Sequence, residues 1–219
     1  MKAGSPSLRV AVLISGSGSN LQAMIDSREA GTLDIDIATV ISNQPQAYGL
    51  RRAREAGIDA QCLPHREFHD RKSFDNALAE LLKEYRVDLV LLAGFMRILT
   101  PEFVAEFEGR LLNIHPSLLP LYPGLDTHRR ALEAGDAWHG STVHFVSEEL
   151  DGGPPIIQGR VRVERGDKPE TLAQRVLKVE HLIYPRAVQL ITEGRVRYAD
   201  RSAWLDGERM TEPLQFETL

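Results

Sequence analysis

The chain has 219 residues and a net charge of −5, with 42% hydrophobic and 26% charged residues. This is the composition of an ordinary globular protein with enough apolar material for a sizeable core. The acidic balance gives no sign of a polyanionic partner such as DNA or RNA, and no segment approaches the roughly 20 apolar residues that a membrane-spanning helix needs.

The amino-terminal segment and the cysteine content predict a cytoplasmic protein. The first ten residues, MKAGSPSLRV, lack the apolar run of a signal peptide. A single cysteine, Cys62, excludes an internal disulfide and fits a reducing compartment. Because Cys62 ends an apolar stretch, we expect a small core residue rather than a nucleophile. The arginines at 51, 52 and 54 are expected on a solvated helix face.

The first half of the sequence alternates short apolar runs with helical patterns. Strands are predicted at 8–14, 34–41, 58–63 and 87–92. Helices are predicted at 19–30, at 46–56 with Gly57 just beyond its end, and at 68–85. This order predicts a parallel sheet covered by helices on both faces. For the whole chain we expect an α/β fold with a Rossmann-like, mostly parallel (mixed) sheet.

The second half is less regular. Thr100 and Pro101 mark a helix start, and a proline-rich loop runs from 116 to 124. Strands are predicted at 110–114, 141–147 and 156–163, the second with one exposed face, and a long helix at 169–193. A small hairpin and a frayed end are expected from about 195. With no repeat or linker, residues 1–219 are predicted to form a single domain.

A glycine-rich turn, Ser15 to Gln22, follows the first strand. Its glycines allow tight backbone geometry and close approach of a ligand. Ser19 and Gln22 have the spacing of a capping box, and a helix start favours an anion such as phosphate. Leu21 stands where a dinucleotide fingerprint needs its third glycine, and no Walker lysine is present. On this motif alone, a phosphate site and a plain structural turn remain equally open.

A second constellation joins three polar residues. Asn113 and His115 end the fifth strand and should project together, because residues two apart share a face of an extended chain. Asp151 opens a loop stiffened by two prolines. An aspartate near His115 would raise the imidazole pKa and fix the ring orientation. A cationic histidine beside an amide could stabilise the oxyanion formed when an amine attacks a carbonyl. The alternative is that both segments are ordinary turns.

At these residues the sequence resembles a known family, the phosphoribosylglycinamide (GAR) formyltransferases. The resemblance covers nearly the whole chain and is specific through the joint order of its segments. These segments are Ile14–Gln22, Leu92–Leu99, Leu112–Pro120, His139–Val146, Asp151–Pro154 and Glu180–His181.

The resemblance implies roles for individual positions. Asn113, His115 and Asp151 match the catalytic triad of the family. Gly18, Ser19, Asn20 and Glu180 match the ribonucleotide site, the first three at its phosphate. Folate contacts are implied for Arg71, Met96, Arg97, Ile98, Leu99 and Asn113, and the pteridine is expected between Leu92, Val104, Leu111 and Val146. Residues 1–100 would then form a phosphate-binding half and 101–219 a folate-binding and catalytic half.

The implied reaction moves a formyl group from 10-formyltetrahydrofolate to the amine of glycinamide ribonucleotide, in purine biosynthesis, without a metal or a covalent enzyme intermediate. Partners are these small molecules, with neither nucleic acid nor membrane, and a homodimer is left open. Asp126 stands where some relatives have histidine, which leaves the contribution of its loop open. A zinc site at His65 and His69 is disfavoured, because Arg66 occupies the position of the zincin glutamate.

Three rival functions remain. Formyltetrahydrofolate deformylase resembles this catalytic core but carries an additional amino-terminal domain, whereas seven residues precede the first predicted strand here. Methionyl-tRNA formyltransferase shares the Asn-x-His and Asp features but adds a tRNA-binding domain and needs a basic surface. A non-catalytic folate or nucleotide binder is disfavoured by the intact Asn113, His115 and Asp151.

Overall fold

The computed structural model describes residues 7–216, and the chain divides into two compact units, Met1–Leu112 and Asn113–Leu219. The first unit follows the predicted alternation of strands and helices. In chain order its elements are β1 (Leu8–Ile14), α1 (Ser19–Glu29), β2 (Ile35–Ser42), α2 (Tyr48–Glu55), β3 (Ala60–Cys62), the short 3₁₀ helix η1 (His65–Glu67), α3 (Arg71–Glu84), β4 (Leu89–Leu92), α4 (Pro101–Glu106) and the start of β5 (Leu111–His115).

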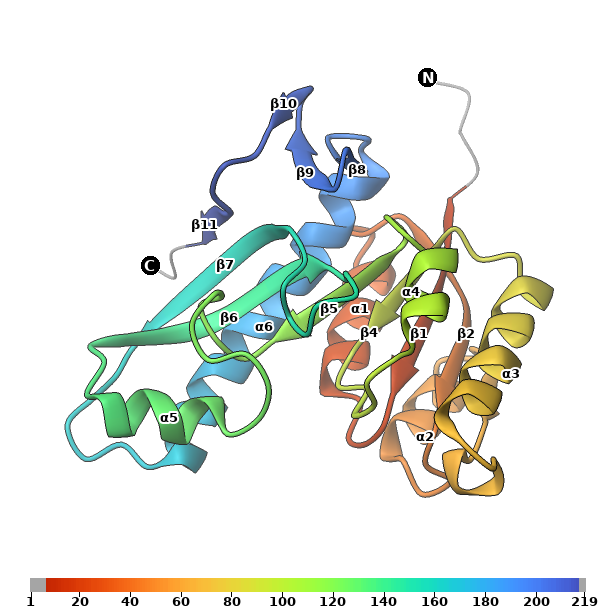
Figure 1. The fold of residues 1–219 in the computed structure, drawn as a ribbon, viewed down its shortest axis with the longest axis horizontal. Helices are drawn as coiled ribbons and strands as arrows, with labels where there is room; N and C mark the ends of the chain where they lie inside the picture. The colour runs from red at the N-terminus through yellow and green to blue at the C-terminus, as the bar shows by residue number, and fades with distance from the viewer. Residues whose placement is uncertain (1–6, 217–219) are drawn as a thin grey trace. The chain divides into compact units, whose positions relative to one another are not determined.

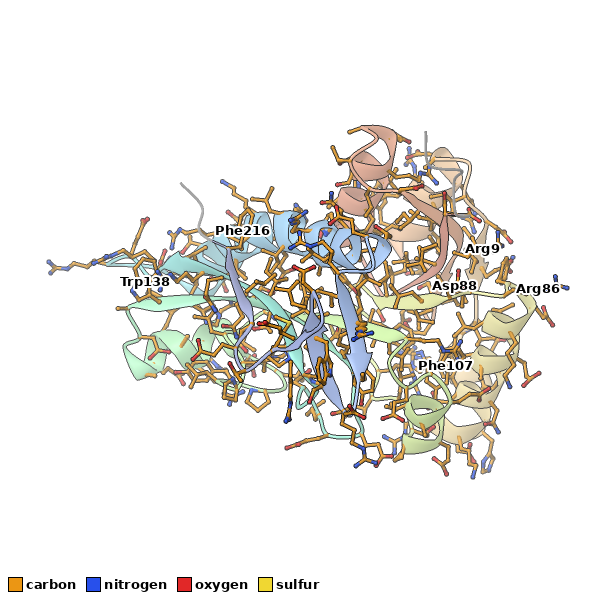
Figure 2. All side chains as sticks on the ribbon, turned by 90° about the horizontal axis from the view of Figure 1, so that it is seen from above. Arg9, Arg86, Asp88, Phe107, Trp138 and Phe216 are labelled. Atoms are coloured by element: carbon orange, nitrogen blue, oxygen red, sulfur yellow. The ribbon has the colours of Figure 1, made fainter. Side chains whose placement is uncertain are left out.

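Within this unit the strands lie in the order β3-β2-β1-β4, and their pairings are parallel. Helix α1 packs against α2, α3 packs against α4, and α1 and α3 lie on opposite sides of β1, β2 and β4 (Figure 1). Helices therefore cover both faces of these strands, as predicted. At the outer end of β1, Arg9 and Asp88 lie near each other (Figure 2), and the Arg9 backbone N–H donates to the Asp88 carboxylate at 2.9 Å.

Continuous apolar runs explain why β1 and β4 are buried on both faces. Residues 10–14 of β1 and all four residues of β4 are buried. A strand covered on both faces needs such an uninterrupted run rather than alternation. The carboxyl ends of these two strands lead into the glycine turn and into the segment from Ala93 to Leu99.

The second unit begins within β5 and contains most of the polar loops. Its further elements are α5 (Thr127–Ala134), β6 (Trp138–Phe145), β7 (Pro155–Arg162), α6 (Pro169–Thr192), β8 (Val196–Ala199), β9 (Ser202–Leu205), β10 (Glu208–Arg209) and β11 (Leu214–Phe216). The strand order is β5-β6-β7-β11, in which β6 and β7 are antiparallel and β7 and β11 parallel. The main sheet is thus mixed, mostly parallel and eight-stranded, which confirms the predicted fold class.

Helix α6 covers strands β6 and β7 (Figure 1). The side chains of Val179 and Ile183 lie directly over Gly159, where an added Cβ would collide with Val179. A glycine in the strand lets the helix approach closely. After α6, strands β8, β9 and β10 form a separate three-stranded antiparallel sheet, which contains the predicted hairpin.

Several expectations need correction. Helix α5 was not predicted, and β6 is buried on both faces beyond Trp138 rather than exposed on one. Residues 214–216 pair with β7 instead of fraying, while the rest of the predicted frayed end, 217–219, lies outside the described residues. Cys62 is exposed rather than part of the core, because it ends the short edge strand β3.

The expected division into a phosphate-binding half, residues 1–100, and a folate-binding and catalytic half, residues 101–219, stays a prediction. Within residues 7–216, no helix combines the length and the apolar character that crossing a membrane requires.

Candidate active site

The second unit brings together the amide, imidazole and carboxylate that the sequence singled out. Asn113 and His115 end β5, where Asn113 is half-buried and His115 buried. The Nδ1 atom of His115 lies 3.4 Å from an Asp151 carboxylate oxygen, in a pair less than a tenth exposed. The expected contact between Asp151 and His115 is therefore present, while the catalytic roles of these residues stay predictions.

A tightly turned loop presents the Asp151 carboxylate. Asp151 has a left-handed backbone with φ of 53°, a conformation that short polar residues tolerate better than most. Its carboxylate also accepts a hydrogen bond from the Gly124 backbone N–H at 2.8 Å. An added Cβ on Gly153 would collide with the Phe145 carbonyl group, so glycine is required there for the loop to lie close to β6.

Both ring nitrogens of His115 face acceptors. Nδ1 faces the Asp151 carboxylate, and Nε2 lies 2.9 Å from the backbone carbonyl oxygen of Tyr122. A neutral imidazole carries one N–H, whereas an imidazolium carries two. Each ring nitrogen of His115 therefore lies beside an oxygen that can accept a hydrogen bond.

A second histidine, His144, contacts the amide of Asn113, and the sequence analysis gave it no role. Its Nδ1 lies 2.8 Å from the Phe145 carbonyl oxygen, which only accepts, so Nδ1 carries the hydrogen. Its Nε2 is then an acceptor and takes a hydrogen bond from the Asn113 amide nitrogen at 3.2 Å. This contact fixes the amide orientation and leaves Asn113 one N–H for a ligand.

His144 is held in the neutral form. Burial lowers the pKa of His144 to about 4, against the opposing effects of the Phe145 carbonyl and the Asp151 carboxylate. An isolated histidine in an apolar strand looks like a core residue, so its contact with Asn113 could be found only from the pairing of distant segments.

A half-buried polar cluster anchors the loop that carries the Tyr122 carbonyl. The Tyr122 hydroxyl donates to Asp136 at 2.6 Å, and Arg130 lies over the Tyr122 ring at 5.2 Å. His128 and His139 face each other through ring nitrogens 3.1 Å apart. Burial, followed by the charge of His128, lowers the pKa of His139 to about 4, so this pair is neutral near pH 7.

Asp126, the residue at which the loop departs from some relatives, precedes α5. It has a left-handed backbone, makes no side-chain cap to the helix, and pairs with Arg129 at 2.7 Å. Both partners are more than half exposed, so this pair contributes little to stability.

In the first unit, the glycine turn lines a small cavity. Gly18 is the N-cap of α1 with a left-handed backbone, φ 68°, and no side chain caps the helix. The capping box expected at Ser19 and Gln22 is therefore wrong, because Ser19 is already the first helical residue. The cavity, about 200 Å³, is lined by residues 15–20 together with Ala93, Gly94 and Met96. Unpaired N–H groups of a first helical turn favour an anion in such a cavity.

The segment from Ala93 to Leu99 is tied to the glycine turn by Ser15. The Ser15 hydroxyl accepts from the Met96 backbone N–H at 2.8 Å and donates to the Asn43 side-chain oxygen at 2.6 Å. Met96 and Ile98 are largely exposed, at 72% and 59%, so both side chains are accessible to a ligand. Leu99, by contrast, is buried.

The other predicted binding residues are less distinctive. Arg97 stacks over the Phe74 ring at 4.7 Å, and Arg71 is exposed at the start of α3. Glu180 is buried on α6 in the second unit. Of the residues expected beside the pteridine, Val146 is half-buried, whereas the others are buried like ordinary core residues: Leu92, Val104 and Leu111.

Cys62 and the two histidines of the disfavoured zinc site, His65 and His69, lie in the first unit. Partial burial and Glu67 raise the pKa of Cys62, which favours the unreactive thiol. His65 contacts the Asn43 carbonyl, and the His69 side chain is 96% exposed. Across residues 7–216, no group of three or more His, Cys, Asp or Glu residues could hold a metal ion.

An α/β sheet with a glycine turn at one strand end, and with Asn113, His115 and Asp151 gathered at another, fits the framework of an enzyme that transfers formyl groups. The sequence profile of the family "Formyl transferase" matches residues 8–188. The chain belongs to this formyl transferase family.

Particular relatives sharpen this assignment. The chain is 50% identical to phosphoribosylglycinamide formyltransferase of Escherichia coli over 203 residues, which is 93% of this chain and 96% of the relative. The solved structure of phosphoribosylglycinamide formyltransferase from Coxiella burnetii is 46% identical, with a TM-score of 0.92, covering 96% of this chain and 99% of that one. A formyltetrahydrofolate deformylase from Pseudomonas syringae is 30% identical, with a TM-score of 0.83, covering 91% of this chain and 66% of that one.

Proposed function

We propose that this protein transfers the formyl group of 10-formyltetrahydrofolate to the amine of 5'-phosphoribosylglycinamide, a step of de novo purine biosynthesis. The observation that carries the proposal is the buried cluster of Asn113, His115 and Asp151 in a chain half identical to a named phosphoribosylglycinamide formyltransferase. The comparisons agree with the predicted class of enzyme, a one-carbon transferase.

The reaction forms one C–N bond and breaks another. The amine nitrogen of the ribonucleotide attacks the formyl carbon, and the carbonyl electron pair moves onto oxygen. Collapse of this tetrahedral intermediate restores the C=O bond and breaks the bond to N10 of the folate. One proton leaves the attacking amine, and one proton reaches N10. These steps require no metal ion and no covalent bond to the enzyme.

The N–H groups of Asn113 and His115 stabilise the oxyanion of the intermediate in this proposal. His144 accepts one N–H of the Asn113 amide, so the second N–H is available to the substrate. Nδ1 of His115 faces Asp151, so Nε2 is the donor toward substrate. The formyl oxygen must then replace the Tyr122 carbonyl at Nε2, which requires local movement of the 116–126 loop.

In this proposal Asp151 orients the His115 ring and takes part in the proton transfer. Its carboxylate faces Nδ1 and is already held by the Gly124 N–H, so its position is fixed before substrate binds. A fixed carboxylate beside an imidazolium favours the charged ring and can pass a proton, directly or through an ordered water, from the attacking amine to N10.

The remaining site residues are proposed to bind the two substrates. The backbone of Gly18, Ser19 and Asn20 would receive the ribonucleotide phosphate, and Glu180 the ribose. The folate would contact Arg71 and Asn113, and the wall formed by Met96, Arg97, Ile98 and Leu99. The exposure of Met96 and Ile98 and the cavity at Gly18 support this part of the proposal.

The test is an assay of the purified protein with both substrates. Formyl transfer that depends on the ribonucleotide, with kcat falling by about 10²–10³ in His115→Ala, is the expected result. Near wild-type turnover of His115→Ala would contradict the proposed mechanism, and absence of transfer in the wild type would contradict the proposed function.

A second candidate is hydrolysis of 10-formyltetrahydrofolate, favoured by the structural likeness to the Pseudomonas syringae deformylase. In this reaction water replaces the amine as nucleophile. Release of formate in the absence of the ribonucleotide, at a rate matching the transfer reaction, would support hydrolysis instead.

A cytoplasmic location and a homodimeric assembly complete the proposal. Composition and the single cysteine support the first. Fractionation of cells and sedimentation of the purified protein test the two statements separately.

A further inference from the structure

The peptide groups of the glycine turn are oriented by helix α2. The Gly16 carbonyl accepts a hydrogen bond from the Gly49 N–H at 3.0 Å, in the first turn of α2. The next carbonyl, that of Ser17, accepts from the Nε–H of Arg52 at 2.9 Å. Two successive carbonyl groups of the turn therefore point toward α2.

The orientation of a carbonyl determines that of the N–H in the same peptide group. In a trans peptide the C=O and the N–H point in opposite directions. With the carbonyls of Gly16 and Ser17 directed to α2, the N–H groups of Ser17 and Gly18 point away from it. Within residues 7–216, neither N–H donates to any backbone carbonyl outside the regular elements. Both belong to residues that line the 200 Å³ cavity.

Close packing holds α2 against the turn. A Cβ on Gly18 would lie 2.6 Å from the Gly49 Cα, and a Cβ on Gly49 would meet both the Ile14 side chain and, at 3.1 Å, the Gly18 Cα. Glycine at both positions lets the two backbones touch. The pairing of the Gly49 N–H with the Gly16 carbonyl depends on this approach.

Arg52 adds a second attachment through its side chain. Its Nη1 donates to the Gln22 side-chain oxygen at 3.0 Å, one turn into α1, and its guanidinium stacks over Tyr48 at 4.8 Å. The guanidinium thus joins the last carbonyl before Gly18 to the first turn of the helix that follows. The Arg52 side chain fixes the geometry of the turn and is not simply one charge on a solvated face.

We infer that Arg52 is a positioning residue for the anion site: it presents the Ser17 and Gly18 N–H groups to the phosphate without contacting the phosphate itself. This inference rests on the proposed function for the identity of the ligand, a phosphate monoester. The neighbouring Arg51 pairs with the exposed Glu55 at 2.7 Å, and the inference gives it no part in the anion site.

The experiment compares Arg52→Met with Arg51→Met, because each removes one positive charge from the same helix. Arg52→Met should raise the KM for the ribonucleotide about tenfold, the scale of one charge-assisted hydrogen bond. Its kcat and its KM for formyl-folate should stay within about twofold of wild type. Arg51→Met should match wild type in all three. Equal ribonucleotide KM values for the two variants would overturn the inference.

A third variant, Gln22→Leu, separates positioning from direct attraction of the phosphate by charge. It removes one attachment of the guanidinium but keeps the charge, so the ribonucleotide KM should rise in the same direction. Combined with Arg52→Met it should add little, since both changes break one arrangement. An unchanged KM in Gln22→Leu would indicate a charge effect and contradict positioning.

Direct binding makes the result independent of the reaction. Calorimetric titration with the ribonucleotide, and with inorganic phosphate as competitor, reads the anion site without formyl transfer. A wild-type protein that binds the ribonucleotide but does not transfer formyl groups would contradict the proposed function alone. Equal affinity of Arg52→Met and Arg51→Met for both ligands would contradict the role of Arg52 alone.

Discussion

Acidification should destabilise the protein through a histidine buried in the neutral form. The pKa of His144 is lowered from 6.5 to about 4 by burial, and the facing groups are the Asn113 amide, the Phe145 carbonyl, Asp151 and His115. Below about pH 6.5 the unfolded chain takes up this proton, whereas the folded chain does so only near pH 4. The stability contribution is therefore full above about pH 6.5 and is lost as the pH falls toward about 4.

The size of the effect follows from the two pKa values. At about pH 5 the unfolded state gains a factor of roughly 30 from protonation, and the folded state almost none. The free energy of unfolding should thus fall by about 2 kcal/mol between about pH 7 and about pH 5 on account of His144 alone. His139, also buried with a pKa of about 4, acts in the same direction.

Urea unfolding at the two pH values measures this change. In His144→Gln, the difference in free energy of unfolding between about pH 7 and about pH 5 should shrink by about 2 kcal/mol, because glutamine does not titrate there. His69→Gln is the matched control, since the His69 side chain is 96% exposed, and it should leave the difference unchanged. If His144→Gln keeps the wild-type pH dependence, the assignment of a neutral, buried His144 is wrong.

Three further changes test the site itself. Asp151→Asn should lower kcat by about 10²–10³, whereas Asp126→Asn, at an exposed pair with Arg129, should stay near wild type; steady-state kinetics would show whether they behave alike. Gly18→Ala should raise the ribonucleotide KM at least about tenfold, but Gly31→Ala, equally left-handed with open space around it, should leave that KM unchanged. Asn113→Asp places a carboxylate where an oxyanion forms, so its kcat should fall below that of Asn113→Ala; the opposite order in single-turnover rates would argue against an oxyanion donor.

The alternation of strands and helices in the first unit could be predicted because burial on both faces leaves continuous apolar runs in the sequence. The end of α2 at Gly57 and the start of α4 at Thr100 were also visible, since glycine with a left-handed backbone and a capping threonine have specific residue preferences. The contact between Asp151 and His115 was expected from the strand ends and turn residues in the sequence. These patterns left both an ordinary turn and a functional site open, and the family resemblance favoured the functional site.

Other elements left no comparable pattern. Helix α5 is only eight residues long and buries only Thr127 and Ala131, so it offers too few apolar residues for a helix to be predicted from their spacing. In β6 the polar residues looked solvent-facing, but they hold the loop after β5. Ser141 donates to the His115 carbonyl at 2.7 Å, and Thr142 to the Ser117 carbonyl at 2.7 Å. The alternation of polar and apolar residues shows which positions are polar, but not whether their hydrogen-bond partners are water or buried protein groups. In β6 the partners are buried carbonyl groups.

The contact made by Arg52 on helix α2 could likewise not be predicted from the local sequence. Three arginines in four residues, at 51, 52 and 54, predict a solvated face, and Arg51 and Arg54 are indeed exposed. The Arg52 side chain, in contrast to these two, faces a backbone carbonyl of a turn more than thirty residues earlier in the chain. Tertiary contacts of this kind cannot be read from local composition.

The two histidines beside Asp151 differ in their hydrogen-bond partners. The His144 ring lies 3.9 Å from the carboxylate at its closest ion-pairing atoms, yet burial keeps its pKa near 4 because one nitrogen donates to a carbonyl and the other accepts from the Asn113 amide. His115 is also buried but faces acceptors on both sides. The neutral His144 ring orients the Asn113 amide beside it. Protonation of His144 at Nε2 would remove the acceptor that holds the Asn113 amide, so the proposed mechanism predicts that formyl transfer weakens as His144 becomes charged.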